Sequence, residues 1–440
     1  MSTLRERIPR PSEWGRREAY LVVGLAAALP RLVVLLLERG TILEEFVEKS
    51  DTFARTLASS GTFGFLPDVP SAYTQPLYAF FLAGLYWPLD RSWVVVGIAQ
   101  IVVAVVTALL VVEIGRRLRS VGIGVVAGLI ATLHPYVVWH DVHVNREILD
   151  GLLVALLTLL ALAAYERRSV PIACAVGAVC GVAILGNARL LVLPVVLAPY
   201  LIWRVRPRFE AIVGVGLVLV FAGAALAPWV FRNETQIGCV AITTDARALW
   251  KANNASTYDV LARGGWIDDV PELPGVPPWP ERAAEISPAA ARAVDECAQM
   301  RFYRDEVIDF WRDQPGEKAR LAAQAVGMLW RPTFTTETAD TAGGGAAAFG
   351  RDVVEPVFMV AVYGLALWGL FLAPAHFVAL ALLLLGTNTA VAMVFAGTVR
   401  YRAPFDLLLA VLAAFALARA WQLAERQLRG DRPFRRSAAS

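Results

Sequence analysis

The residues of this 440-residue chain that could do chemistry are carboxylates and arginines at the ends of long apolar runs. The acidic candidates are Asp51, Glu147 and Asp150. A carboxylate can act as a general base toward a hydroxyl or amine that accepts a sugar. On a helix, Arg146, Glu147 and Asp150 share a face, because residues three and four apart are neighbours there. A helix N-cap or solvated carboxylate for Asp51, and a structural ion pair for Glu147, stay open as alternatives.

Five arginines form a second set, because each sits within a turn or two of a predicted outer membrane boundary. They are Arg146, Arg189, Arg232, Arg400 and Arg402. Charged groups near hydrocarbon are costly and tend to face a cavity or a partner. Guanidinium binds phosphate bidentately and keeps its proton, so the group predicts an anionic ligand such as a lipid phosphate. For any single arginine, snorkelling or pairing with a local carboxylate is the alternative.

Three of the four histidines cluster between two predicted spans. His140 and His143 are three residues apart, which permits a metal site on a helix, but no clear third ligand accompanies them. We therefore expect no cofactor; a divalent metal stays open as an alternative that nothing else in the sequence supports. His134, His140 and His143 are interpreted as the polar lining of a cavity. The sequence also lacks a P-loop or dinucleotide-binding fingerprint.

Membrane-spanning helices are expected to hold these residues in place. The chain is 57% hydrophobic and 18% charged, whereas a soluble domain is about 45–50% apolar and about 25% charged. The apolar excess sits in runs of about twenty residues, the length that crosses roughly 30 Å of hydrocarbon. About ten spans are predicted, at residues 19–38, 92–114, 121–139, 146–165, 170–186, 189–204, 210–231, 353–372, 374–396 and 401–421.

Arginines in the short loops predict the orientation of these spans. One alternating set of helix ends carries the arginines of 116–119, 167–168 and 204–208 together with both basic termini. This set is predicted to be cytoplasmic, so both termini lie inside. The first apolar run is interpreted as a retained span rather than a cleaved signal peptide. We expect a multi-pass protein of the inner (plasma) membrane with its active site on the extracytoplasmic side.

The predicted organisation has five parts and two large extracytoplasmic loops. The parts are a basic N-terminus at 1–18, a transmembrane region at 19–231 containing the first outer loop at 39–91, a large outer loop at 232–352, C-terminal transmembrane helices at 353–421 and a basic tail at 422–440. Both loops are expected to contain short helices, one of them lying along the membrane surface. The expected pieces are Pro76–Pro88, a helix from Ser287-Pro288 to Pro315-Gly316, a helix over Glu317–Trp330, and a flexible lead at Gly343–Gly345.

Two cysteines lie in the second outer loop. Cys239 and Cys297 can form a disulfide if that side of the membrane is oxidising. Two unpaired thiols are the alternative that the sequence leaves open.

Taken together, these residues resemble the bacterial branch of the GT-C glycosyltransferases. That branch includes protein O-mannosyltransferase-like enzymes and the aminoarabinose transferase of lipid A. The stretch from Asp51 to Gly64, followed by Gln75-Pro76-Leu77-Tyr78, resembles the family's first outer loop. Further similar motifs are His134-Pro135 with Arg146-Glu147, Asn187-Ala188-Arg189, Pro228-Trp229 through Arg232-Asn233, Leu249-Trp250 with Asn253-Asn254, and Arg400-Tyr401-Arg402-Ala403-Pro404.

The resemblance implies an all-α, GT-C-type polytopic fold and an inverting sugar transfer. The implied donor is a hexose or pentose on a polyprenyl phosphate, and the acceptor is an extracytoplasmic glycan, lipid or protein of the cell envelope. By position, Asp51 is implied as the general base and Glu147 as a second acidic residue of the site. The candidates for binding the lipid phosphate or the sugar are Arg146, Arg189, Arg232, Arg400 and Tyr401.

Two departures from the family pattern bear on the acceptor and the sugar. Thr52 follows Asp51, where many eukaryotic protein mannosyltransferases carry an acidic residue, and this argues against protein O-mannosylation. Gln75 stands where the aminoarabinose enzyme has a basic residue nearby, so aminoarabinose transfer is unsupported.

The rival interpretations are a multi-pass transporter, a polyprenyl-linked glycan polymerase or ligase, and a non-enzymatic scaffold. A transporter is expected to show internal repeats and broken helices at the midplane. A polymerase or ligase would place its key residues in late outer loops. We do not expect nucleic-acid binding, because no basic patch interleaved with aromatic residues lies outside the apolar runs.

Overall fold

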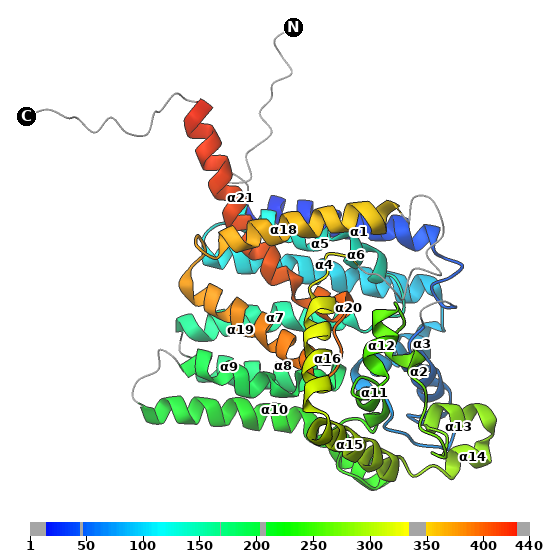
Figure 1. The fold of residues 1–440 in the computed structure, drawn as a ribbon. Helices are drawn as coiled ribbons and strands as arrows, with labels where there is room; N and C mark the ends of the chain where they lie inside the picture. The colour runs from blue at the N-terminus through cyan, green and yellow to red at the C-terminus, as the bar shows by residue number, and fades with distance from the viewer. Residues whose placement is uncertain (1–14, 45–46, 168, 203–207, 334–348, 429–440) are drawn as a thin grey trace, which may run out of the picture.

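The computed structural model describes residues 15–44, 47–167, 169–202, 208–333 and 349–428. Within these ranges the chain is helical apart from its connecting loops and one isolated β-bridge between Leu66 and Val69. Long helices lie side by side in a bundle, and short helices gather at one end of it (Figure 1). The all-α fold predicted from the apolar runs is therefore confirmed.

Seven helical segments of the described chain are long and apolar enough to cross a membrane. They contain α1 (Arg16–Leu37), α4 (Trp93–Leu118), α7 (Glu147–Arg167), α10 (Arg208–Ile237), α18 (Glu355–Gly369), α19 (Ala375–Val394) and α21 (Asp406–Leu428). The shorter apolar helices are α3 (Pro76–Leu89), α5 (Val121–Thr132), α8 (Val170–Gly186) and the run of η1 (Ala188–Val192) into α9 (Leu193–Ile202). The chain is thus a multi-pass membrane protein. The predicted spans fall in helical regions of the described chain, two of them divided at prolines, and the count of about ten stays a prediction.

Two predicted spans differ from the observed helices at prolines. The span predicted at 121–139 is broken, because α5 ends at Thr132 and a separate helix, α6 (Pro135–His140), follows. Proline has no N–H to donate and disfavours helical backbone at the preceding residue, here His134. Likewise, α20 (Val399–Arg402) and η4 (Ala403–Phe405) precede α21, with Pro404 in the irregular turn. These breaks leave polar backbone at the outer end of the bundle.

Small residues let the bundle helices approach closely, as is usual in membranes. A side chain at Gly369 of α18 would place its Cβ 2.0 Å from the carbonyl oxygen of Leu412 of α21. At the other side of the bundle, a Cβ at Gly177 of α8 would meet the carbonyl oxygen of Val218 of α10 at 2.4 Å. The first half of α21 is buried among these helices, so this helix runs through the core before its last turns project beyond the bundle (Figure 1).

The two outer segments pack against each other at one end of the bundle, as their predicted common sidedness requires (Figure 1). The first carries α2 (Lys49–Ser60) and α3. Thr244 N–H of the second segment donates to the carbonyl of Ala72 at 2.9 Å. The second segment carries α11 (Ala246–Lys251), α12 (Thr257–Ala262), η2 (Ile267–Asp269), α13 (Pro280–Ile286), α14 (Pro288–Arg292), α15 (Glu296–Asp313) and α16 (Pro315–Leu329).

The helix predicted from Ser287 to Pro315 is wrong in its continuity. Ser287 does cap a helix, since its Oγ accepts the Ala290 N–H at 3.1 Å, but α14 ends at Arg292. Asp295 then caps α15, accepting the Ala298 N–H at 2.8 Å. A side-chain acceptor at an N-cap satisfies a donor that the helix leaves free, and a second cap starts a second helix. The predicted helix at 317–330 corresponds to α16, and Gly343–Gly345 lie outside the described residues.

Cys239 and Cys297 form a disulfide. It joins the chain just beyond α10 to the first turn of α15. The sequence left open a disulfide or two unpaired thiols, and the structure has the disulfide. This bond fixes the second outer segment to the end of a membrane helix.

Candidate active site

A cavity of about 610 Å³ lies where the outer helices meet the outer ends of the bundle helices. Its lining comes from both outer segments and from the helix ends. The residues that reach it from the first segment are Glu48, Lys49, Thr74 and Gln75; the helix ends contribute Arg146, Arg189, Phe395, Arg400 and Tyr401. Four of the seven residues predicted for the site, Arg146, Arg189, Arg400 and Tyr401, therefore lie around one cavity. We call this the main cavity.

Arg189 lies on the membrane side of the main cavity. Its guanidinium carbon is 3.4 Å from the centre of the Tyr401 ring and 5.3 Å from that of Phe395. The Asn187 side chain accepts the Arg189 backbone N–H at 3.2 Å and so holds the start of η1. Within the described chain no carboxylate forms an ion pair with Arg189. A guanidinium stacked on aromatic rings without a carboxylate partner is suited to bind an anion.

Arg146 lies beside the start of α7 and is only partly satisfied. One terminal nitrogen donates to Gln75 Oε1 at 2.6 Å, while the buried Nε has no hydrogen-bond partner. The nearest carboxylate oxygen belongs to Glu147, 3.7 Å from that Nε. Burial acts to lower the pKa of Arg146, but nearby carboxylates, Glu147 foremost, raise it on balance. The side chain therefore stays charged, with donor capacity to spare.

Arg400 joins three segments that are far apart in the sequence. Its Nε donates to Glu147 Oε1 at 2.6 Å, and its terminal nitrogen forms an ion pair with Glu48. Glu48 is the residue that immediately precedes α2, and Glu147 is the first residue of α7. One guanidinium is thus shared between two carboxylates. Glu147 also borders a smaller inner cavity behind the main one.

Asp51 is buried in the first turn of α2, and only 1% of it is exposed. The Tyr86 hydroxyl donates to its Oδ1 at 2.6 Å, and Arg91 Nε lies 3.0 and 3.2 Å from its two oxygens. Arg55, one turn further along α2, adds a looser ion pair at 3.8 Å. Asp51 is not among the residues that line the main cavity. Its assignment as the general base stays a prediction.

Arg232 lies apart from the main cavity. Its guanidinium donates to the backbone carbonyls of Ser71 at 2.8 Å and Phe63 at 2.9 Å. It borders a separate groove of about 480 Å³ beside Trp229. These contacts fasten the first outer segment to α10. Arg402, the fifth boundary arginine, is fully buried and bonded to Asp406 at 3.1 Å.

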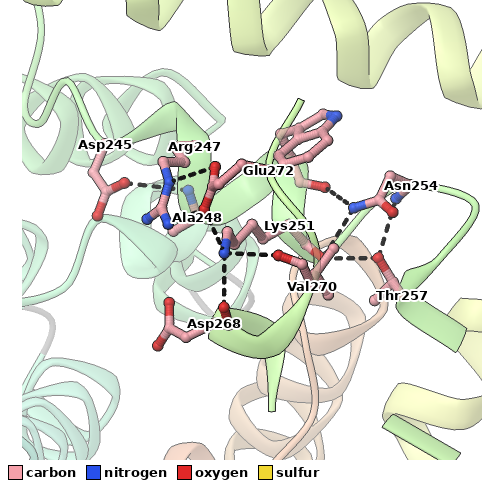
Figure 2. Close-up of polar contacts among 10 residues, drawn as sticks. Asp245, Arg247, Ala248, Lys251, Asn254, Thr257, Asp268, Val270 and Glu272 are labelled. Atoms are coloured by element: carbon pink, nitrogen blue, oxygen red, sulfur yellow. Dashed lines mark hydrogen bonds and ion pairs between the residues drawn. The ribbon is translucent and has the colours of Figure 1, made fainter. Parts of the chain in front are cut away.

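The outer wall of the main cavity, formed by the second outer segment, holds a network of polar contacts around Lys251 and Arg247, shown in Figure 2. Lys251 of α11 is 2% exposed. Its ammonium donates to the carbonyls of Asp268 at 2.7 Å and Val270 at 2.9 Å, and pairs with Glu272 at 2.7 Å. Arg247 pairs with the same carboxylate and lies over the Trp279 ring at 3.7 Å. Three acceptors for three ammonium protons leave Lys251 with no donor to offer a ligand.

His134 and His140 line the small inner cavity, of about 70 Å³, and His143 is not among its lining residues. His140 stacks on Tyr136, and His143 stacks on Trp139 with its Nδ1 2.9 Å from that residue's carbonyl. Nearby, Arg31 and Asp141 form an ion pair of 2.7 Å. In the part of the chain that the structure describes, no group of three histidine, cysteine or acidic side chains is placed to hold a metal ion.

Sequence reasoning did not assign several charged residues of the cavity, among them Glu48, Lys49, Arg247 and Lys251. Composition offered one signal, because Lys49 and Lys251 are two of only three lysines in the chain. The sequence carried no signal for Glu48, because no local pattern distinguishes whether Glu48 or Asp51 faces the cavity.

Part of this site lies in a stretch whose sequence is similar to a known family. Residues 70–231 match the family model described as dolichyl-phosphate-mannose-protein mannosyltransferase. The matched stretch contains Gln75, Arg146, Glu147 and Arg189, while Glu48 and Arg400 lie outside it. No curated protein matches the chain by sequence.

Two solved structures are similar to the chain over most of its length. The first is the archaeal oligosaccharyltransferase AglB from Archaeoglobus fulgidus, in complex with an inhibitory peptide and a dolichol-phosphate. It has a TM-score of 0.52 and 12% identity, and the alignment covers 97% of this chain and 53% of that one. This chain therefore spans about half the length of AglB.

The second is ArnT from Cupriavidus metallidurans bound to undecaprenyl phosphate. It has a TM-score of 0.40 and 16% identity, and the alignment covers 93% of this chain and 80% of that one. The likeness to AglB concerns the fold, and the family match concerns the sequence of residues 70–231. Residues 70–231 therefore resemble the mannosyltransferase family in sequence, and the chain resembles AglB in fold.

Proposed function

We propose that the protein is a membrane glycosyltransferase that moves a hexose or pentose from a polyprenyl-phosphate donor to an acceptor at the extracytoplasmic face. The observation that carries this proposal is the pair Arg189 and Arg146. Both guanidiniums reach the membrane side of the main cavity; within the described residues, Arg189 has no carboxylate partner and Arg146 has an unused donor. A lipid phosphate at the membrane surface supplies the acceptor atoms that they lack. The AglB structure, which shares the fold, holds a dolichol-phosphate.

The proposed transfer is inverting. A carboxylate takes the proton of the acceptor hydroxyl as its oxygen attacks the anomeric carbon, and the bond to the phosphate breaks on the opposite face. Arginines that already point at the departing phosphate stabilise the charge that grows there. The family resemblance assigns the base to Asp51 and a second acidic role to Glu147. The acceptor is proposed to be a cell-envelope glycan, lipid or protein.

The proposed location is the inner membrane, with both termini cytoplasmic and the main cavity outside. Two features support this sidedness. The sequence predicts that the arginine-rich short loops lie on the opposite side of the membrane from the outer segments. The Cys239–Cys297 disulfide also lies in the second outer segment, and disulfides persist in oxidising compartments such as the periplasm.

The test is binding of undecaprenyl phosphate to the purified full-length protein, followed by native mass spectrometry, with undecaprenol as the uncharged control. Wild-type protein is expected to bind the phosphate and not the alcohol. Arg189→Ala is expected to bind the phosphate much more weakly, whereas Arg312→Ala, on the exposed face of α15, binds it as wild type does. Equal binding of alcohol and phosphate would contradict the proposal.

A second measurement separates transfer from transport. A strain lacking the gene is compared with its parent by mass spectrometry of envelope glycans and lipid-linked sugars. A transferase is expected to leave the loaded donor in place and the acceptor without its sugar. A transporter or a polymerase would instead change the sidedness of the donor or the length of the glycan.

A further inference from the structure

Among the described residues of the first outer segment, Glu48 is the carboxylate that lines the main cavity. We propose that Glu48 takes the proton from the acceptor hydroxyl, and that Asp51 is a positioning residue that holds α2. This inference rests on the proposed transferase function, and it assigns the base to a residue that the sequence resemblance passes over.

The position of Glu48 suits it to reach the cavity. It is the N-cap residue of α2, with extended backbone (φ −71°, ψ 152°), and its side chain makes no capping hydrogen bond. The carboxylate is therefore not used by its own helix and instead extends to Arg400. The side chain is 15% exposed, so it is largely shielded from bulk water yet borders the cavity.

Asp51 has the opposite surroundings. Both of its oxygens are engaged, by the Tyr86 hydroxyl and by Arg91, and it lies behind the cavity wall between α2 and α3. A base must come within hydrogen-bond reach of the proton that it removes. For Asp51 to do so, these buried contacts would have to break. The same contacts fix the first turn of α2 and thereby the direction in which Glu48 points.

Arg400 couples Glu48 to the donor. Its Nε bonds Glu147 and its terminal nitrogen pairs with Glu48, all beside the main cavity. A guanidinium has five donors in a rigid fork. Arg400 can therefore keep its bonds to both carboxylates and offer a remaining donor to an arriving phosphate. The negative charge of that phosphate near Glu48 raises the affinity of the Glu48 carboxylate for a proton as the donor binds.

The step balances without any other reactant. The acceptor O–H bond breaks and its proton passes to a Glu48 oxygen. The acceptor oxygen forms the new bond to the anomeric carbon, and the old carbon–oxygen bond breaks with its electron pair leaving on the polyprenyl phosphate. Nothing is oxidised or reduced. Glu48 then returns its proton to water in the cavity.

The variants that test this proposal are Glu48→Gln, Glu48→Asp, Asp51→Asn and a matched control, Glu44→Gln, whose side chain is exposed in the same segment. Each is expressed as the full chain in the deletion strain at equal membrane levels. Three quantities are measured: the envelope sugar that the deletion removes, its rate of formation in isolated membranes as a function of pH, and the binding of undecaprenyl phosphate to purified protein.

Glu48→Gln is expected to lower the rate by about 100-fold or more, the scale of a lost general base. It is also expected to abolish the acid limb of the pH profile and to bind undecaprenyl phosphate at least as tightly as wild type. Glu48→Asp keeps the acid limb with a partial rate. Asp51→Asn keeps the acid limb but lowers the thermal midpoint, and Glu44→Gln matches wild type.

Two outcomes overturn the assignment, and they are distinguishable. If wild type forms the sugar and Glu48→Gln does so at the full rate with its acid limb intact, Glu48 is not the base. The Asp51 assignment then stands if Asp51→Asn alone loses the acid limb without loss of stability. If wild type neither binds undecaprenyl phosphate nor restores any sugar, the proposed function itself fails, and the Glu48 role falls with it.

Discussion

The membrane side and the outer wall of the main cavity both carry cationic side chains, but these side chains differ in how fully the protein pairs them. On the membrane side, Arg189 has no carboxylate partner within the described residues and Arg146 has a buried nitrogen without an acceptor. On the outer wall, Lys251 has three acceptors for three protons, and Arg247 is paired with Glu272. Buried polar groups are normally satisfied by the protein. Cationic side chains with unused donors therefore indicate a ligand-binding site. Cationic side chains whose donors are all used by the protein indicate a structural role.

The largest expected effect comes from the membrane side. Arg189→Ala is expected to weaken undecaprenyl phosphate binding by about 10- to 100-fold, because a hydrogen bond to a charged group contributes roughly 1.5–3 kcal/mol. The thermal midpoint should stay near that of wild type, since no carboxylate is left unpaired. Titration of purified protein with the lipid, followed by intrinsic fluorescence, measures the affinity. An unchanged affinity of Arg189→Ala for undecaprenyl phosphate would contradict the proposed difference between the membrane side and the outer wall.

Breaking the disulfide tests the outer wall as a whole. The double variant Cys239→Ser/Cys297→Ser opens a loop with a sequence separation of 58 residues. The outer segment is expected to lose about 3 kcal/mol of stability. Hydrogen exchange of α11 to α15 should rise while that of the bundle helices is unchanged. An equal rise in both regions would mean that the wall and the bundle unfold together.

A smaller loss is expected at the centre of the wall. Lys251→Met removes the ammonium and leaves two carbonyls and part of Glu272 unmatched. The expected cost is about 2 kcal/mol, in the range of an unsatisfied buried group, and Glu272 is exposed enough for water to compensate part of it. Undecaprenyl phosphate affinity should change by less than about threefold. A large loss of affinity with unchanged stability would make Lys251 a ligand contact instead.

The smallest effect is a pH dependence of the same network. Burial acts to raise the pKa of Glu272, but hydrogen bonds from Arg247 and Lys251 lower it on balance. A carboxylate whose pKa is lower in the folded state adds stability above its unfolded pKa, and this is lost as the pH falls through the folded pKa. Limited proteolysis should therefore open residues 246–272 in acid. In Lys251→Met this pH dependence should be weaker; an identical acid response would assign it to another group.

The bundle was predictable because its signal is local. Apolar runs of membrane length mark each helix whatever the rest of the chain does. The gathering of Arg146, Arg189, Arg400 and Tyr401 followed from the same reasoning, since helix ends at one depth and on one side must lie near each other. Even the break at Pro135 carried a local signal, although the span across it was predicted as continuous.

The outer wall could not be predicted in this way, and neither could the choice of first-loop carboxylate that points toward the cavity. Lys251 reaches the wall because the second segment crosses the first at Thr244 and Ala72. Asp51 turns from the cavity because Tyr86 and Arg91, 35 and 40 positions later, hold it. Neither contact leaves a periodic pattern, so apolar spacing could not distinguish Asp51 from Glu48.

The shared position of Arg400 has a consequence for biosynthesis. It lies 253 positions after Glu147, so both of its carboxylate partners enter the membrane region long before the guanidinium that neutralises them is translated. A nascent chain that stops before α20 carries two acidic side chains at the membrane boundary with this counter-ion missing. The last helices therefore complete the site as well as the bundle, and a separately expressed piece containing α18 to α21 is a natural candidate for reassembly with the rest.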